Sequence, residues 1–183
     1  MRILIVSDAW LPQVNGVVRT IESTRDELRR RGHTVEVPGP DRFASIPCPT
    51  YPEIRLAIGQ SRRMARLVDE FDPDAIHIST EGPLGWAARR YCIRRRLSFT
   101  TSFHTQFPEY VQLRTGMPLA STYALLRHFH RAASAVMVAT DTLERNLATR
   151  GFRRLARWSR GVDTERFRPA ARPERERPRH LYV

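Results

Sequence analysis

The sequence opens with residues 1–20, MRILIVSDAWLPQVNGVVRT, and this stretch decides the fold class. Residues 3–6 form a continuous apolar run, which is typical of a strand buried on both faces of a parallel sheet. A loop over residues 7–15 follows, and a helix is predicted over residues 16–31, with Gly32 as its C-terminal stop. A strand, a loop and a helix in this order make the first half of a βαβ unit.

The remainder of the chain repeats this alternation. Residues 38–52 contain five prolines and are predicted to be an irregular loop. Predicted strands cover residues 34–37, 75–78, 99–102, 135–139 and 155–159, and predicted helices cover 61–71, 84–96, 120–132 and a segment that Asp141 caps and that ends near Gly151. The pattern predicts an α/β fold with a Rossmann-like parallel sheet and helices on both faces.

In such a sheet, ligands bind beyond the carboxyl ends of the strands. This rule directs attention to the loops over residues 7–16, 79–83, 103–118, 140–141 and 160–163. Every candidate site residue below comes from one of these loops.

Composition narrows the class of protein. No apolar run approaches the about 20 residues of a membrane span, and the apolar N-terminus is too short for a signal peptide, so we expect a cytoplasmic protein. All 31 basic residues are arginine, and the net charge of +12 attracts phosphates, anionic lipid headgroups or nucleic acid. Cys48 and Cys92 fit neither a disulfide framework nor a zinc site.

The first candidate site follows the first predicted strand. Asn15 and Gly16 stand at a predicted helix start, where exposed backbone N–H groups and the helix dipole suit a phosphate, although many Asn-Gly pairs are plain turns or caps. Trp10 in the same loop either stacks on a ligand or anchors the core. The loop contains neither GxGxxG nor GxxxxGK[ST], so the common nucleotide-binding fingerprints are absent.

The other candidates lie on the later loops. Glu81 either hydrogen-bonds a sugar hydroxyl or caps the following helix. His104, with Thr105 beside it, is placed to polarise a sugar oxygen, whereas a single histidine is more often structural. Arg160 either meets an anionic group or is solvated like many other arginines of this chain.

No metal site is predicted. The sequence Asp72-Pro73-Asp74 is similar to a DxD metal motif, but it precedes a predicted strand and therefore lies at the amino end of the sheet, where we interpret it as a turn. His128 and His130 are two residues apart on a predicted helix and do not share a face, so they are poor metal ligands.

Five segments, taken in order, resemble retaining glycosyltransferases of family 4, which have the GT-B fold. The segments are SDAWLPQVNGVVRT, PCPTYPEIRLA, STEGPLG, SFHTQFPEY and SRGVDTERFRP, and the resemblance spans residues 1–169. Within the family, the chain is most similar to GDP-mannose-dependent α-mannosyltransferases and sulfoquinovosyl-diacylglycerol synthases.

The resemblance implies an N-terminal, acceptor-side domain over residues 1–168, followed by a linker and the first strand of a donor-binding domain over residues 169–183. It implies that the backbone of Gly16 contacts the donor diphosphate and that His104 lies near the transferred sugar. The predicted site is catalytic His104, with Gly16, Asn15 and Arg160 on the diphosphate and Trp10, Glu81 and Thr105 on the acceptor side.

The resemblance also implies transfer with retention, without a metal or cofactor, from a nucleotide-sugar such as GDP-mannose or a UDP-sugar. The implied acceptor is a lipid or glycan, and the basic surface suits an anionic membrane. In relatives a Gly-Arg turn, a lysine and an acidic pair bind the donor, and this sequence contains none of them, so we expect little or no transfer by the chain alone. The alternatives are a non-catalytic module that binds a nucleotide-sugar or anionic lipid and, less favoured, a nucleic-acid-binding domain.

Overall fold

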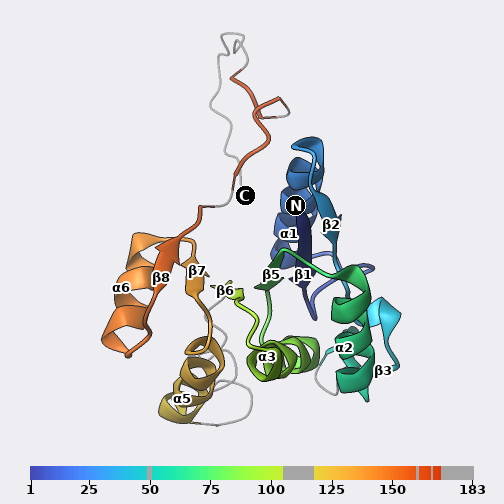
Figure 1. Ribbon diagram of the computed structural model, residues 1–183. Helices are drawn as coiled ribbons and strands as arrows, with labels where there is room; N and C mark the ends of the chain where they lie inside the picture. The colour runs from blue at the N-terminus through green and yellow to red at the C-terminus, as the bar shows by residue number, and fades with distance from the viewer. Residues whose placement is uncertain (49–50, 105–117, 160, 166, 170–183) are drawn as a thin grey trace.

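A computed structural model describes residues 1–48, 51–104, 118–159, 161–165 and 167–169. Its centre is a six-stranded sheet in the order β2-β1-β5-β6-β7-β8, and every pair of neighbours is parallel (Figure 1). The order reverses between β1 and β5, so the topological switch point lies between their carboxyl ends. The strands are β1 (Arg2–Val6), β2 (Thr34–Glu36), β5 (Ala75–Ile78), β6 (Thr100–Phe103), β7 (Ala135–Val138) and β8 (Leu155–Arg157).

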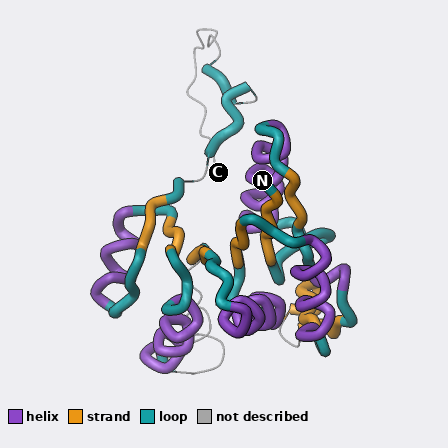
Figure 2. The backbone as a smooth tube through the Cα atoms, viewed as in Figure 1, coloured by secondary structure: helices purple, strands orange, loops and turns teal. Residues whose placement is uncertain are grey.

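Helices cover both faces of the sheet, as the sequence predicts. Strand β1 shows why: Leu4 and Val6 pack in the main core, whereas Ile3 and Ile5 pack in a second cluster beneath α1. Figure 1 shows α1 beside β1 and β2, while α3 and α5 lie below β5 and β6, and Figure 2 shows the same layers by type of element. The helices are α1 (Gly16–Arg30), α2 (Gln60–Phe71), α3 (Pro83–Arg95), α5 (Leu119–His130) and α6 (Asp141–Thr149).

The prediction of an irregular loop over residues 38–52 is wrong. A short 3-10 helix, η1 (Pro40–Arg42), is followed by an antiparallel hairpin of β3 (Ser45–Cys48) and β4 (Tyr51–Ala57). A two-stranded ribbon tolerates proline because each strand has an edge that needs no N–H donor. The register shifts between Pro47 and Cys48, which is where the ladder is interrupted.

The predicted cap of the last helix is also wrong by one residue. The hydroxyl of Thr140 accepts a hydrogen bond from the backbone N–H of Leu143 at 3.2 Å, so Thr140 is the cap. Asp141 is instead the first helical residue and forms an ion pair with Arg157. Both residue types cap helices well, and only the backbone geometry distinguishes the two positions.

The turn before β5 confirms the interpretation of the DxD-like sequence. Asp74 accepts a hydrogen bond from the backbone N–H of Arg2 at 2.7 Å, at the amino end of the sheet. Within the described ranges, no group of three or more His, Cys, Asp or Glu side chains is arranged to hold a metal ion. In the same part of the chain, no helix has both the length and the apolar character of a membrane span. The predicted domain boundary at residue 168 stays a prediction, since residues 170–183 lie outside the described residues.

Candidate functional site

The loop after β1 ends in an exposed helix start. The side-chain oxygen of Asn15 accepts hydrogen bonds from the backbone N–H groups of Val17 and Val18, both at 3.0 Å. Asn15 is therefore the N-cap of α1, and Gly16, the first residue of the helix, is exposed. The first turn contains no acidic residue, so the positive end of this helix has only a neutral cap.

Trp10 lies in the same loop but is buried in the second core cluster, with 7% of its surface exposed. A Cβ added to Gly39 would lie 2.5 Å from the Cβ of Trp10, so the backbone of residue 39 packs directly on the indole. The guanidinium of Arg25 lies 5.4 Å from the ring centroid. The structure thus places Trp10 as a core anchor, which was the alternative interpretation, and its contribution to an acceptor site stays a prediction.

A second helix start, that of α3, is capped by the side chain of Asp8, a residue that the sequence reasoning missed. Its carboxylate accepts hydrogen bonds from the backbone N–H groups of Leu84 at 2.8 Å and Gly85 at 3.2 Å, and from the Thr80 hydroxyl at 2.9 Å. Burial raises the pKa of Asp8, and these hydrogen bonds oppose the rise. A Cβ on Gly82 would lie 2.4 Å from Cγ of Asp8, so only glycine leaves room for this carboxylate.

Glu81 is not the cap of α3. Its Oε1 lies 3.1 Å from Nε2 of His130, a residue of α5 that is 2% exposed. The other ring nitrogen of His130 lies 2.9 Å from the Thr101 hydroxyl. The Glu81 side chain is 22% exposed and is held in place by the buried ring of His130. A carboxylate fixed in this way is suited to orient a polar ligand.

His104 lies just past β6 and is held by two serines. Its Nε2 lies 2.8 Å from the hydroxyl oxygens of Ser79, after β5, and of Ser102, in β6. The Ser102 hydroxyl also lies 3.1 Å from Nε2 of His77, whose Nδ1 lies 2.8 Å from the Thr100 hydroxyl. Burial, and to a lesser degree the neighbouring His104, lower the pKa of His77 to about 3.

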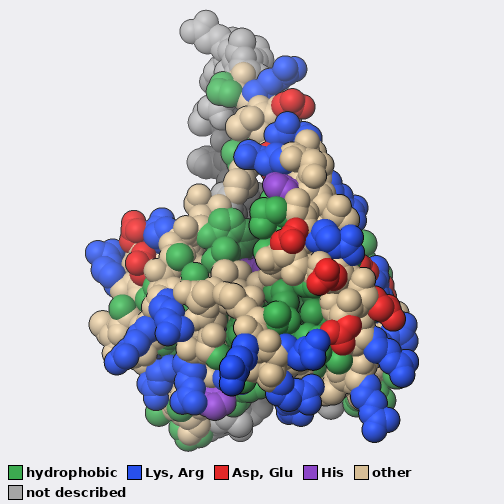
Figure 3. All heavy atoms as spheres, viewed as in Figure 1, with side chains coloured by type: hydrophobic (Ala, Val, Ile, Leu, Met, Phe, Trp, Pro, Cys, Tyr) green, Lys and Arg blue, Asp and Glu red, His purple; other side chains and the backbone are tan. Residues whose placement is uncertain are grey.

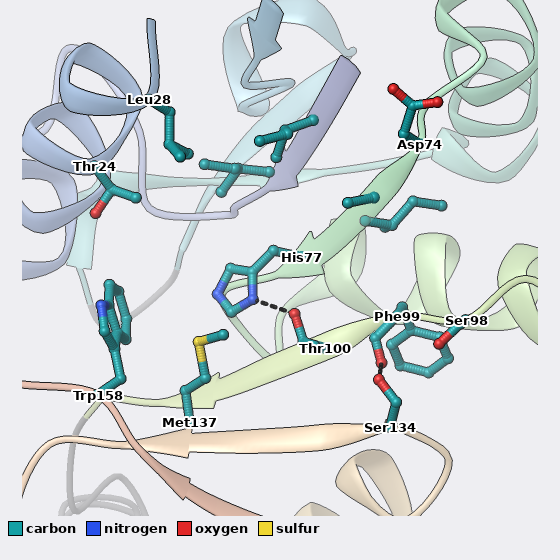
Figure 4. Close-up of a pocket in the computed structure, with 14 residues that line it drawn as sticks. Thr24, Leu28, Asp74, His77, Ser98, Phe99, Thr100, Ser134, Met137 and Trp158 are labelled. Atoms are coloured by element: carbon teal, nitrogen blue, oxygen red, sulfur yellow. Dashed lines mark hydrogen bonds between the residues drawn. The ribbon is translucent and has the colours of Figure 1, made fainter. Parts of the chain in front are cut away.

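One cavity adjoins His77, and another adjoins the loop after β1. A cavity of about 340 Å³ runs along the α1 face of the sheet, where His77, Met137 and Trp158 point into it (Figure 4). It extends to Asp74 and Ser134 at the amino ends of strands, away from the predicted site edge. The smaller cavity, about 300 Å³, adjoins the loop after β1 and lies between Trp10, Pro12, Phe43 and Arg55, among others.

Part of the predicted site lies on the loops that follow the carboxyl ends of the strands. Asn15, Gly16, Glu81 and His104 all follow carboxyl ends of strands, as expected. Thr105 and Arg160 lie outside the described residues. The sequence reasoning missed Asp8 and the residues that hold Glu81 and His104. For Asp8 the available signal was Gly82: this residue is the N-cap of α3 and has no side chain that could cap the helix, so the cap must come from elsewhere.

Arginine side chains lie along the rim formed by α2, α3 and α5 (Figure 3). They are spread over this face and are interrupted by polar and apolar side chains. On the face shown, the basic side chains are therefore not gathered into one continuous patch.

Comparison with known proteins identifies the family. The model of Glycosyltransferase Family 4 matches residues 14–166, a range that includes the helix start at Gly16, Glu81 and His104. The chain belongs to glycosyltransferase family 4. As a family 4 member it is 31% identical over 193 residues to a GDP-mannose-dependent alpha-mannosyltransferase of Mycobacterium tuberculosis (strain CDC 1551 / Oshkosh), with 95% of this chain and 51% of that protein covered.

One further relative and one solved structure are similar to this family 4 chain. It is 30% identical over 139 residues to the sulfoquinovosyl transferase SQD2 of Arabidopsis thaliana, and the aligned region covers 74% of this chain and 27% of that protein. The solved structure of UDP-GlcNAc 2-epimerase from Methanocaldococcus jannaschii superposes with a TM-score of 0.54 at 12% identity, over 85% of this chain and 45% of the epimerase, and supports the fold alone. The chain spans about half the length of the mannosyltransferase relatives that it matches.

Proposed function

We propose that this chain forms the acceptor-side half of a retaining glycosyltransferase that moves a hexose, mannose-like, from a nucleotide-sugar to a lipid or glycan acceptor. One observation carries the proposal: the open helix start at Gly16 and the serine-held ring of His104 lie on the carboxyl side of β1 and β6, on the two sides of β5 in the sheet of a family 4 protein. A donor that spans them would place its diphosphate at the helix and its sugar at the ring.

The diphosphate end of the proposal rests on electrostatics. Backbone N–H groups at the start of α1 and the helix dipole attract negative charge, and the neutral Asn15 cap does not oppose it. In the reaction, the same groups would stabilise the charge that develops on the leaving nucleotide, with Arg160 as a further cation. No metal or cofactor is part of the proposed reaction. The names of two relatives, which specify GDP-mannose, favour that donor over a UDP-sugar.

The acceptor end rests on the other side chains. Glu81, oriented by His130, would accept a hydrogen bond from an acceptor hydroxyl, with Thr105 and the loop around Trp10 beside it. A lipid acceptor would require the protein to work at the cytoplasmic face of a membrane, and the net charge of +12 suits anionic headgroups. Co-sedimentation with phosphatidylglycerol vesicles should be strong at low salt and lost at high salt, whereas neutral vesicles should bind little.

The test is a transfer assay with GDP-mannose and an extract of lipid and glycan acceptors. The chain alone should show little or no transfer, and the chain fused to the C-terminal half of the mannosyltransferase of Mycobacterium tuberculosis should be active. In the fusion, His104→Ala should lower kcat/KM about 100-fold, because a positioned polar group near the reacting sugar is lost. The exposed histidine variant His128→Ala is the matched control and should be as active as the parent.

Three outcomes would contradict the proposal: normal turnover by the chain alone, an active His104→Ala fusion, or no transfer by a folded parent fusion. Binding of GDP-mannose by the chain alone, with no transfer by that fusion, would favour the alternative function, a non-catalytic module that binds a nucleotide-sugar.

A further inference from the structure

The smaller cavity lies where three segments meet. The loop after β1 contributes residues 10–13, the 3-10 helix η1 contributes Pro40 and Asp41, and the hairpin of β3 and β4 contributes Ser45 and Arg55. Its volume of about 300 Å³ is at the lower end of the range of ligand pockets, so it suits one small ring and not a long chain.

One wall of this cavity is apolar and firmly anchored. Trp10 and Phe43 both line it, and each is only 7% exposed. Trp10 belongs to the second core cluster and Phe43 to the main one, so the cavity lies at the junction of the two cores. Pro12 and Pro40 extend the same lining. Rings held in this way offer a preformed apolar surface to the C–H groups of a ligand.

The hydrogen-bond donor of the cavity is Arg55. Its Nε donates to the hydroxyl of Ser45 at 3.1 Å, and its Nη2 donates to the carbonyl oxygen of Ser45 at 2.6 Å. Because Arg55 pairs with Pro47, two residues from Ser45, both side chains belong to one face of the hairpin. The guanidinium is therefore fixed, while Nη1 donates to none of the residues that the structure describes.

The hydrogen-bond acceptor of the cavity is Asp41. A Cβ on Gly39 would lie 2.7 Å from Oδ1 of Asp41 and 2.5 Å from Cβ of Trp10, so glycine lets the carboxylate and the indole approach the same point. Within the described part of the chain, Asp41 accepts no hydrogen bond and forms no ion pair with Arg55. The cavity thus has one group that only accepts and one that only donates, and neither neutralises the other.

These two groups select the class of ligand. A phosphate would meet the carboxylate of Asp41, and a cation would meet the guanidinium of Arg55. A hydrocarbon tail would take both groups from water without giving either a partner, which is costly. A neutral ring with several hydroxyl groups satisfies both, because a hydroxyl donates and accepts, and its C–H groups can pack on the apolar wall.

Gln13 connects the cavity to the open helix start. It lines the cavity, and its Oε1 accepts a hydrogen bond from Nδ2 of Asn15, the N-cap of α1, at 3.3 Å. Its Nε2 donates to the carbonyl oxygen of Asp8 at 3.3 Å. A ring in the cavity would therefore be separated by a single side chain from the cap of the helix at which the diphosphate is proposed to bind.

We propose that this cavity is a subsite for a neutral polyhydroxyl ring of the acceptor, with Asp41 accepting and Arg55 donating hydrogen bonds to its hydroxyl groups. The chemistry of the ring follows from the cavity, whereas its place in an acceptor rests on the function proposed above. The terminal sugar of a glycan and the polyol headgroup of a lipid share this chemistry. The subsite would disfavour a phosphate in place of the ring.

The experiment is ¹H–¹⁵N correlation NMR on the full chain with ¹⁵N-labelled tryptophan. The sequence has three tryptophans, and the Trp86→Phe and Trp158→Phe spectra assign all three indole signals. Methyl α-mannoside, which represents a glycan end, and myo-inositol, which represents a lipid headgroup, are titrated separately. At least one should shift the Trp10 signal to saturation and leave Trp86 and Trp158 unchanged, and the tighter ligand identifies the source. Inorganic phosphate should leave Trp10 unchanged.

Variants of the two charged residues test their roles. Asp41→Ala and Arg55→Met should each weaken binding of the ring about tenfold, because a hydrogen bond to a charged group is lost. Glu70→Ala and Arg62→Met are the matched controls, since both residues are exposed on α2 and do not line the cavity, and should bind like the parent. Near-ultraviolet circular dichroism identifies any variant that has not folded, and Asp41→Asn, which keeps one acceptor, should show a smaller loss.

The outcomes separate the subsite from the function on which it builds. The subsite is overturned if neither ring shifts Trp10, if phosphate shifts it equally, or if folded Asp41→Ala and Arg55→Met bind like the parent. If a ring binds as expected while the fusion transfers no sugar, the subsite stands and the proposed function fails. In an active fusion, Asp41→Ala should raise the KM for the acceptor about tenfold and leave kcat nearly unchanged, and the reverse pattern would contradict a role in acceptor binding.

Discussion

Helices α1 and α3 follow the two strands that flank the switch point of the sheet, β1 and β5, but the positive ends of their dipoles are treated differently. Helix α3 receives a carboxylate from Asp8, which is buried and accepts hydrogen bonds from two backbone N–H groups of the helix. Helix α1 has only the neutral amide of Asn15, and Gly16 is exposed. One helix dipole is satisfied within the protein, and the other is left for a charge from outside.

This difference explains which loop can serve a ligand. An anion at the start of α3 would have to displace Asp8, whereas an anion at the start of α1 meets no negative side chain in the first turn. The Asp8 carboxylate also links the loop after β1 to the loop after β5, and this link helps to hold the loop that leads to the open start of α1. The contrast leads to four predictions.

Removal of the buried carboxylate should have the largest effect. Asp8→Ala leaves two buried N–H groups of α3 and the Thr80 hydroxyl without their acceptor, and should lower the free energy of unfolding by about 3 kcal/mol. Asn15→Ala should lower the free energy of unfolding by only about 1 kcal/mol, because the backbone N–H groups that Asn15 caps can hydrogen-bond to water instead. Urea unfolding measures both, with the exposed Asp41→Ala as control. Equal costs for the two caps would refute the contrast.

A methyl group at Gly82 should displace the carboxylate without removing it. The added Cβ would lie 2.4 Å from Cγ of Asp8, so Gly82→Ala should destabilise the fold by about 2 kcal/mol through overpacking. Gly161→Ala is the matched control, because its Cβ would meet no atom within 4 Å. If thermal unfolding shows the same small change for both variants, Asp8 is not held as tightly as described.

A negative charge at the open helix start should make it resemble α3. Asn15→Asp keeps a capping oxygen, so the free energy of unfolding should change by less than about 0.5 kcal/mol. Binding of GDP by the fusion described above, measured by calorimetry, should weaken about tenfold through charge repulsion at the diphosphate. Asn15→Ser, a neutral cap, should bind GDP like the parent. Unchanged affinity in Asn15→Asp would place the diphosphate elsewhere.

A change of pH should have the smallest effect on the free energy of unfolding, and it should act through His77, which caps neither helix. The pKa of His77 is about 3 in the folded chain against an ordinary value of 6.5, so the unfolded chain binds more protons below about pH 6.5. Its stabilising contribution is complete above that pH and is lost as the pH falls toward 3. Between about pH 7 and 5 we expect a loss of about 1 kcal/mol after allowance for partial exposure. His77→Gln should remove this slope, and a slope of equal size in that variant would assign it to other groups.

The sequence predicted the fold where local pattern and burial agree. The apolar run of β1 is continuous because alternate residues pack in two different cores, and the apolar run of β7 gives a similar signal. The hairpin of β3 and β4 escaped prediction because its prolines indicate a loop unless the strands are known to have free edges. Local pattern cannot show which edges are free.

The candidate site was predicted only where it is local. The Asn15 cap lies within three residues of its partners, and His104 follows its strand directly. Asp8 and its partner Leu84 are 76 residues apart, and Glu81 and His130 are 49 apart, so nothing near either residue in the sequence announces the contact. The chemistry-bearing residues could thus be placed on loops, but the side chains that orient them required the folded structure.

Burial of Trp10 has a consequence for the thermodynamics of ligand binding. It pins the nine-residue connection between β1 and α1 near its middle, so that neither half spans more than a few residues. Fixing the backbone of a residue costs roughly 1–2 kcal/mol of conformational entropy. In this protein that ordering takes place when the chain folds and the indole enters the core. A ligand that reaches the loop therefore meets a preorganised backbone, and its affinity is not diminished by ordering it.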